Sequence, residues 1–339
     1  MKTLIIRTDR LGDFYQTIPY INCLARIYGK TNVDIVVKKH IYPHIKKKKY
    51  LYNKLYSFEE SGIFNKVLLI VKLRKNNYKQ IIIFDGKDRS IILSKFLNVD
   101  KIFHTYPRKK INLLTKISFS KKYTTILDNQ TMPLKHLYKN ILDKIDVRII
   151  KKDYKILLHQ NIKKINIFKN ENIKNKKYIL IHLDEKWFSD FYIKKYTDIS
   201  LKKKDFFLFI KKIVKRCRKN LIITTGTIDL PFITEISNEY FNINKKGYCY
   251  LKIGKYKIIL LKKISIENLE IITMNANSVI TCHGPLSLIS GSFNINLIDI
   301  IEKNQEKWYE RHTSHIMKYN KLYRIKFSKL AKKIILKLK

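Results

Sequence analysis

Cysteine, acidic residues and long apolar runs are all scarce in this chain of 339 residues. Its four cysteines lie far apart without metal-ligand spacing, so we expect reduced thiols and a cytoplasmic location. No uninterrupted apolar run approaches the roughly 20 residues of a membrane-spanning helix. Charged residues follow Ile6 at once, which is not the pattern of a signal peptide. We therefore expect a protein that is soluble or binds a membrane only peripherally.

Several enzyme signatures are also missing. Walker-type and Gly-x-Gly-x-x-Gly loops are absent, which argues against a nucleotide hydrolase or a dehydrogenase. The Gly-x-Ser-x-Gly turn of serine hydrolases is absent as well. No Asp-x-Asp pair precedes a candidate donor loop; the nearest approximation, Asp85 and Asp88, has a wider spacing. We therefore expect neither a divalent metal nor another cofactor.

Positive charge is abundant. The chain has 71 lysines and arginines and 27 acidic residues, which gives a formal net charge of +44. Compositional drift explains part of it, because Lys, Ile, Asn and Tyr are frequent throughout the chain. The functional alternative is a polyanionic partner, either nucleic acid or an anionic membrane surface. No nucleic-acid-binding motif accompanies the 22 tyrosines. We therefore favour peripheral binding to the inner face of the cytoplasmic membrane over nucleic acid.

Residues 318–339 have the pattern of a basic amphipathic helix or pair of helices, which we interpret as a helical tail. The apolar positions of this tail could meet lipid or pack on a domain instead; they are Leu322, Ile325, Leu330, Ile334 and Leu336. Together with the net charge, the tail predicts membrane binding that high salt reverses.

Strands and helices alternate along both halves of the chain, which predicts an α/β fold with two doubly wound parallel sheets. Expected strands of the first half are 33–37, 80–85 and 101–104, and expected helices are 63–73, 91–97 and 134–145. Expected strands of the second half are 178–182, 221–226, 256–261, 278–282 and 296–301, and expected helices are 205–214, 265–274 and 286–292. We divide the chain into domains 1–160 and 178–317, a linker region at 161–177 and the tail at 318–339.

The first thirty residues hold the most informative motif. The apolar run Thr3-Leu4-Ile5-Ile6 is followed by Arg7-Thr8-Asp9-Arg10-Leu11-Gly12-Asp13, and a helical pattern then runs to a C-cap at Gly29. Ligands of open α/β sheets bind at such carboxyl ends of strands. Gly12 permits close backbone approach, and the helix dipole keeps Asp13 ionised. Asp13 is then either a general base or only a helix cap.

This segment, continued by Thr17-Ile18-Pro19, resembles the amino terminus of the family 9 glycosyltransferases, the heptosyltransferases of lipopolysaccharide core assembly. Residues 78–90, with Tyr-x-x-Ile-Ile-Ile-Phe-Asp and Arg-Ser, and His136-Leu137-Tyr138 resemble two further segments of that family. The resemblance implies the GT-B architecture, two Rossmann-like domains facing each other across a cleft. It also implies that Asp13 is the base that deprotonates the acceptor. For the acceptor we expect contacts from Arg10, Gly12, Lys87, Arg89 and His136.

A second motif, His283-Gly284-Pro285-Leu286-Ser287, stands between an expected strand and helix. A helix that begins there would offer its amino terminus to a pyrophosphate, although a plain Gly-Pro turn with a satisfied histidine explains the local sequence too. The family has an Asp-Thr-Gly-Pro-x-His motif at this position, which binds the nucleotide-sugar donor. Gly284 and Pro285 match it, whereas Cys282, His283 and Ser287 replace the Asp, Thr and His.

Two further strand ends of the second half complete the expected donor site. Lys186 follows strand 178–182 and resembles the lysine of the family's Lys-x-Trp segment, although here it is adjacent to Trp187 and the loop is shorter. It would neutralise a departing diphosphate unless it is an ordinary surface lysine. Thr225 and Gly226 end the next strand, where a base or ribose could pack. The donor residues expected from the sequence are thus Lys186, Thr225, Gly226, His283, Gly284, Pro285 and Ser287.

These observations predict an inverting, metal-independent glycosyltransferase that moves a sugar, heptose by the resemblance, from a nucleotide sugar to a lipopolysaccharide-core or related anionic glycan acceptor. One alternative is a basic nucleic-acid-binding protein. Another is a homologue of GT-B fold that has lost activity, suggested by the altered residues at 282, 283 and 287.

Overall fold

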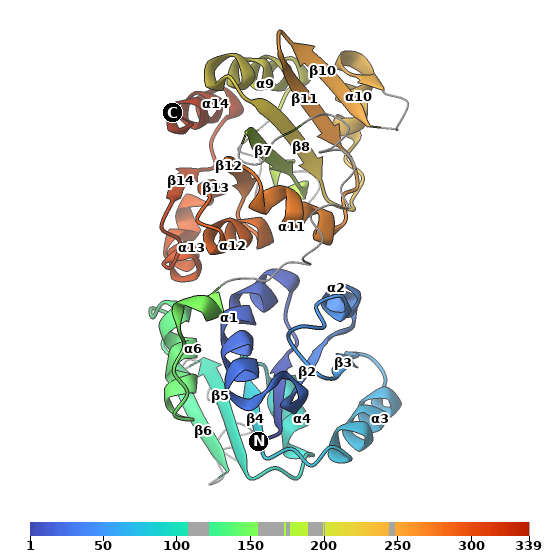
Figure 1. The fold of residues 1–339 in the computed structure, drawn as a ribbon, viewed down its shortest axis with the longest axis vertical. Helices are drawn as coiled ribbons and strands as arrows, with labels where there is room; N and C mark the ends of the chain where they lie inside the picture. The colour runs from blue at the N-terminus through green and yellow to red at the C-terminus, as the bar shows by residue number, and fades with distance from the viewer. Residues whose placement is uncertain are drawn as a thin grey trace. The chain divides into compact units, whose positions relative to one another are not determined.

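A computed structural model describes residues 1–107, 122–154, 173, 177–188, 199, 201–243 and 248–338 of the chain (Figure 1). The chain divides into two compact units. The first contains Met1–Leu157 and Glu310–Ser314, and the second contains Leu158–Tyr309 and His315–Lys339. Almost all of the expected linker, 161–177, lies outside the described residues, so its conformation stays a prediction.

The first unit is built on a parallel sheet of six strands in the order β3-β2-β1-β4-β5-β6. This is the strand order of a Rossmann fold, whose switch point lies between the first and fourth strands. The strands are β1 (Thr3–Arg7), β2 (Val33–Lys38), β3 (Leu55–Phe58), β4 (Gln80–Ile83), β5 (Lys101–Pro107) and β6 (Tyr123–Asp128). All residues of β1 and β4 are buried, as expected for central parallel strands with both faces covered.

Helices cover both faces of this sheet. Alternate residues of β1, Leu4 and Ile6, share a core with Leu69 and Leu73 on one face, while α1 and α6 contact each other on the other. The helices of this unit are α1 (Leu11–Tyr28), α2 (Tyr42–Lys46), α3 (Ile63–Arg74), α4 (Asp88–Lys95) and α6 (Leu134–Asp143). Helix α1 ends as expected at Gly29, whose φ of 81° favours glycine.

The second unit repeats the same topology with an added hairpin. Its sheet has eight strands in the order β14-β13-β12-β7-β8-β11-β10-β9. Neighbouring strands are parallel except that β10 is antiparallel to both β11 and β9. The strands are β7 (Tyr178–Leu183), β8 (Asn220–Thr225), β9 (Asn242–Ile243), β10 (Cys249–Ile253), β11 (Tyr256–Leu261), β12 (Ser278–Cys282), β13 (Asn296–Ile301) and β14 (Tyr319–Tyr323). Its switch point lies between β7 and β12. The expected pair of doubly wound sheets is confirmed.

The helices of the second unit are α9 (Lys203–Cys217), α10 (Pro231–Tyr240), α11 (Ile266–Met274), α12 (Pro285–Ser292), α13 (Glu306–Thr313), which continues into the first unit, and α14 (Phe327–Lys337). Ser265 is the N-cap of α11, and its side chain accepts a hydrogen bond from the Asn268 amide. Among the described residues, no helix is both long and apolar enough to cross a bilayer.

The interpretation of residues 318–339 as a helical tail holds for only part of the segment. Residues 318–339 begin with β14, which pairs with β13. They continue into α14, whose apolar side Phe327, Leu330 and Ile334 is buried in the core of the second unit. The amphipathic pattern reflects packing on the domain, the alternative that the sequence left open.

Candidate functional site

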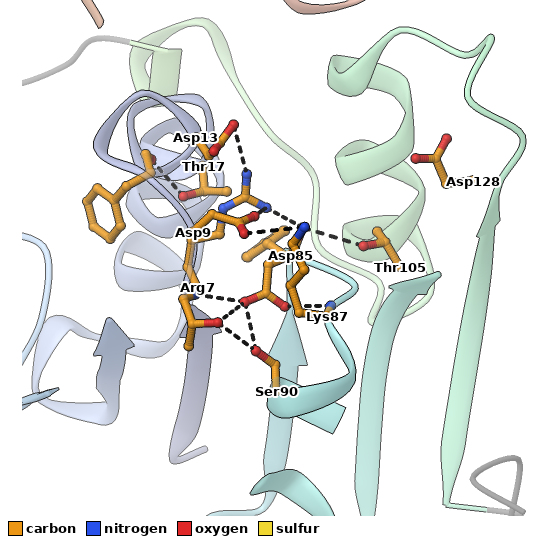
Figure 2. Close-up of polar contacts among 12 residues, drawn as sticks. Arg7, Asp9, Asp13, Thr17, Asp85, Lys87, Ser90, Thr105 and Asp128 are labelled. Atoms are coloured by element: carbon orange, nitrogen blue, oxygen red, sulfur yellow. Dashed lines mark hydrogen bonds and ion pairs between the residues drawn. The ribbon is translucent and has the colours of Figure 1, made fainter. Parts of the chain in front are cut away.

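The switch point of the first unit is organised by Asp85, just beyond β4. One oxygen of its carboxylate, Oδ2, accepts hydrogen bonds from the Thr8 amide at 2.7 Å, the Thr8 hydroxyl at 2.8 Å and the Ser90 hydroxyl at 2.7 Å (Figure 2). The other oxygen, Oδ1, accepts from the Lys87 amide at 3.1 Å. Asp85 thus ties the ends of β1 and β4 to the start of α4, which fixes the loops of the site.

Arg7 is a buried cation at the end of β1. Its guanidinium donates to the carbonyl of Phe84 and lies over the Tyr138 ring, 5.6 Å from the centroid. Burial lowers the pKa of Arg7, but Tyr138 and the nearby carboxylates outweigh that effect, so its pKa stays raised. The side chain is 4% exposed. Arg7 therefore places a permanent positive charge beneath the carboxyl edge of the sheet.

Asp13 and Asp9 both lie near this guanidinium (Figure 2). Oδ1 of Asp13 is 4.0 Å from Nη2 of Arg7, and Oδ2 of Asp9 is 3.7 Å from Nη1. Burial raises the pKa of Asp9, while Arg7 opposes the shift. The Asp13 side chain is 31% exposed against 14% for Asp9, so Asp13 is the carboxylate that solvent or an acceptor reaches.

Asp13 does not act as a conventional helix cap. The N-cap of α1 is Arg10, which makes no side-chain capping hydrogen bond, and Asp13 stands within the first turn. The interpretation of Asp13 as only a cap is therefore wrong, and its position still benefits from the helix dipole. A carboxylate that is partly exposed and held near a buried cation can accept a proton from a bound hydroxyl group.

The structure brings some of the expected acceptor residues together. Arg89 donates to the Thr8 carbonyl at 2.7 Å and the Thr8 hydroxyl at 2.8 Å, and Lys87 Nζ lies 3.9 Å from Asp9 Oδ1. Arg10 is exposed at the mouth of α1, and Gly12 lies in its first turn. His136 is exposed in the first turn of α6, and no contact to a described residue links its side chain to this cluster.

The second switch point brings together Lys186 and Gly284. Lys186 follows β7 in a short 3-10 helix (Glu185–Trp187), and its ammonium donates to the carbonyl of His283. A Cβ added at Gly284 would lie 3.3 Å from Lys186 Nζ. Gly284 is the N-cap of α12 and Pro285 is its first residue. The ammonium thus lies at the amino terminus of a helix, where an anion would meet both positive charge and a favourable dipole.

Asp184 supports this lysine. Its carboxylate accepts from the Lys186 amide at 3.2 Å and lies 3.6 Å from Nζ. Burial raises the pKa of Asp184, although Lys186 opposes the shift. The lysine is 24% exposed, so it is not an ordinary surface side chain.

His283 and Ser287 are held by a buried carboxylate instead of pointing freely outward. Asp299 on β13 accepts from the Ser287 hydroxyl at 2.9 Å and lies 2.7 Å from Nδ1 of His283. Ser287 is fully buried, and its hydroxyl also accepts from the Gly284 amide at 3.3 Å. The Ser287 side chain therefore braces the turn, and its expected contact with the donor stays a prediction. The satisfied-histidine interpretation fits His283.

Thr225 is likewise used within the fold. It is 3% exposed, and its hydroxyl accepts from the Lys263 amide at 3.0 Å. The side chain thus closes the end of β8, and the expected contact of Thr225 with the donor stays a prediction. Gly226 is partly exposed, and no atom of the residues that the structure describes lies within 4 Å of a Cβ added there.

Four charged residues of the two sites were not chosen as site residues from the sequence. Asp299 and Arg7 are buried charges within apolar strands, whereas Asp9 and Asp184 lie within two residues of a strand end. A charged residue inside an apolar strand is the signal that could have identified the first two, because it is costly to bury without partners. Among the described residues, no group of three or more His, Cys, Asp or Glu side chains could hold a metal ion.

Known proteins share this fold across almost the whole chain. No family model and no curated protein matches the sequence. A glycosyl transferase family 9 structure from Veillonella parvula superposes with a TM-score of 0.67, over 95% of this chain and 85% of the other, at 12% identity. The ADP-heptose LPS heptosyltransferase II of E. coli gives a TM-score of 0.65, over 100% and 98%, at 11% identity. The fold is that of these transferases.

This finding confirms, at the level of fold, the resemblance read from the sequence and the GT-B class. The same fold serves another activity, since a UDP-GlcNAc 2-epimerase from Methanocaldococcus jannaschii superposes with a TM-score of 0.56, over 100% of this chain and 93% of the other, at 14% identity. Function must therefore be argued from the two switch points.

Proposed function

We propose that this protein is a glycosyltransferase that moves a sugar from a nucleotide-sugar donor to a hydroxyl group of a lipopolysaccharide-core or related glycan acceptor. The observation that carries the proposal is the division of charge between the switch points. The first offers a partly exposed carboxylate, Asp13, beside a buried cation. The second offers an ammonium, Lys186, at the start of a helix. Glycosyl transfer needs a base for the acceptor and positive charge for the departing diphosphate.

The reaction proceeds with inversion. A carboxylate oxygen of Asp13 removes the acceptor proton as the acceptor oxygen attacks the anomeric carbon from the face opposite the diphosphate. The bond between the anomeric carbon and the diphosphate oxygen breaks, through a transition state with oxocarbenium character. The nucleoside diphosphate leaves as an anion, stabilised by Lys186 and the amino terminus of α12. These residues supply the needed charges without a metal ion, and the named heptosyltransferase relative suggests heptose as the sugar.

A homologue without activity is the second candidate. It is favoured by one observation: the side chains that replace the family's donor residues, His283 and Ser287, are bound to Asp299 within the fold. The nucleic-acid alternative has only the net charge of +44 and the 22 tyrosines in its favour.

A panel of nucleotide sugars, with and without glycan acceptors, tests the proposal. Thermal shift would report donor binding, and mass spectrometry would follow the products in the presence of a metal chelator. Donor binding followed by acceptor-dependent release of nucleoside diphosphate is expected. Conversion of the donor without acceptor would indicate an epimerase, and binding without turnover would indicate the inactive homologue. Absence of any donor binding would refute the proposal.

A further inference from the structure

Helix α3 has an exposed apolar side. The residues on it are Ile63, Phe64, Val67, Leu68 and Val71, exposed by 81, 73, 49, 41 and 45%. At 3.6 residues per turn these positions fall within roughly 140° of the helix circumference. The opposite side packs on the sheet through Leu69 and Leu73. Helix α3 is therefore apolar on both sides, and only one side is covered by described residues.

Basic residues frame this exposed side. Lys72, Arg74 and Lys75 follow it at the end of the helix, and Lys66 flanks its start. Two acidic residues, Glu59 and Glu60, precede the helix, but both form ion pairs. Glu59 pairs with Lys39 at 3.0 Å, and Glu60 pairs with Lys38 and with Arg89, each at 2.8 Å. The charge available around the apolar surface is thus positive.

The positive charge continues into a cavity of about 530 Å³ beside the end of α3. Apolar residues including Leu73 and Phe96 line it together with the cations Arg74, Lys95 and Lys122, and none of the described lining residues is acidic. Arg74 Nε donates to the Phe96 carbonyl at 2.7 Å, which joins the ends of α3 and α4. Phe96, 50% exposed, thereby extends the apolar surface.

We propose that α3 is the membrane-binding surface of this protein and lies in the interface of an anionic phospholipid bilayer. The apolar side enters the boundary between head groups and acyl chains, and the lysines and arginines meet lipid phosphates. Nucleic acid would satisfy the charge but not the exposed phenylalanine and isoleucine. A second copy of this chain would bring the same cations into contact with their equivalents, which is repulsive at a net charge of +44.

The location of α3 serves the proposed function. Glu60, three residues before the helix, pairs with Arg89, which in turn donates to the Thr8 carbonyl in the loop before Asp13. The exposed start of α3 is thus connected to the edge of the first unit that carries the candidate base. The inference rests on the proposed function only in the reason that it gives for membrane binding. Membrane binding itself is tested without donor or acceptor.

Vesicle flotation of the full chain tests the apolar contribution. Wild type should float with phosphatidylglycerol-containing vesicles, float little with phosphatidylcholine alone, and be released by high salt. Replacing Phe64→Ser and Val67→Ser should lower partitioning about tenfold, since each removes buried apolar area. The matched control is Ile243→Ser with Met317→Ser, because these residues are 71 and 85% exposed in the second unit. Thermal unfolding of each variant confirms that the fold is intact.

Charge reversal distinguishes α3 from the rest of the basic surface. Lys72→Glu with Lys75→Glu should reduce partitioning more than Lys332→Glu with Lys333→Glu, the same change on exposed positions of α14. Equal effects of the two pairs would overturn the proposal in favour of diffuse attraction. So would unchanged binding in the serine variants, equal binding to neutral vesicles, or loss of all vesicle binding to a competing DNA duplex. A wild-type dimer that the α3 variants convert to a monomer would assign the surface to a second copy.

Discussion

Nη2 of Arg7 lies 4.0 Å from Oδ1 of Asp13, with the guanidinium buried and the carboxylate partly exposed. The cation therefore acts on the carboxylate from within the protein, where screening by salt is weak. The attraction limits the directions in which the carboxylate can point. This relationship makes separate predictions for the two residues.

Asp13→Asn should reduce sugar transfer by roughly 100-fold or more, the scale expected when a general base is removed. Donor affinity should change little, because the donor residues belong to the second unit. Steady-state transfer rates and calorimetric titration with the nucleotide sugar measure the two quantities. Asp205→Asn, which alters an exposed carboxylate in the first turn of α9, is the matched control. If Asp13→Asn transferred sugar at the wild-type rate, Asp13 would not be the general base.

Arg7→Gln should reduce sugar transfer about tenfold or more, because the Asp13 carboxylate loses the buried cation that helps to position it. Arg7→Lys keeps a positive charge at this place and should lose less of the rate. Steady-state kcat/KM of the three proteins measures the difference, and thermal unfolding confirms that each variant is folded. Equal kcat/KM in wild type and Arg7→Gln would show that Arg7 does not position the base.

Gly284→Ala should weaken donor binding about tenfold, which corresponds to the loss of one hydrogen bond to a charged group. The reason is steric, because the new methyl group would lie 3.3 Å from Lys186 Nζ and push the ammonium from its place. Gly226→Ala is the natural control, since its methyl group would meet no atom within 4 Å. Titration calorimetry compares the variants. If both substitutions weaken binding equally, the displacement of Lys186 is not the cause.

Glu270→Gln should stabilise the protein in alkaline solution relative to wild type. Burial raises the pKa of Glu270 from 4.5 to about 8. Between these values the folded chain keeps a proton that the unfolded chain has released, so the free energy of unfolding falls as pH rises. The difference in Tm between variant and wild type should therefore grow from about pH 5 to about pH 8. Glu235→Gln, at a 57% exposed side chain, should show no such trend.

Local patterns in the sequence predicted the main elements and the location of each switch point. The first strand and helix, β1 and α1, were identified because the spacing of apolar residues changes between them. The apolar residues of β1 are consecutive, those of α1 recur at helical spacing, and Gly29 marks the end of the helix. Lys186 and Gly284 were chosen from different strand ends, and the parallel register of β7 and β12 brings them together. Topology thus follows from the alternation of elements along the chain.

What the sequence could not give was the burial of particular polar side chains. Ser287 and His283 look available in the motif, but Asp299, whose partnership depends on the pairing of β12 with β13, binds them both. Residues 318–339 show the same limit. Their apolar period is identical for a helix on lipid and a helix on a domain, and only the burial of Phe327, Leu330 and Ile334 in the core of the second unit decides between them.

Lys186 is anchored through the main-chain carbonyl of residue 283. Every amino acid presents that oxygen, so the side chain at this position can be exchanged without removing the acceptor. A lineage whose composition drifts toward lysine, isoleucine and asparagine could lose the residues that define such a motif and still hold the same ammonium in place. Comparisons that score residue identities would register such a site as eroded, whereas its electrostatics would have been inherited intact.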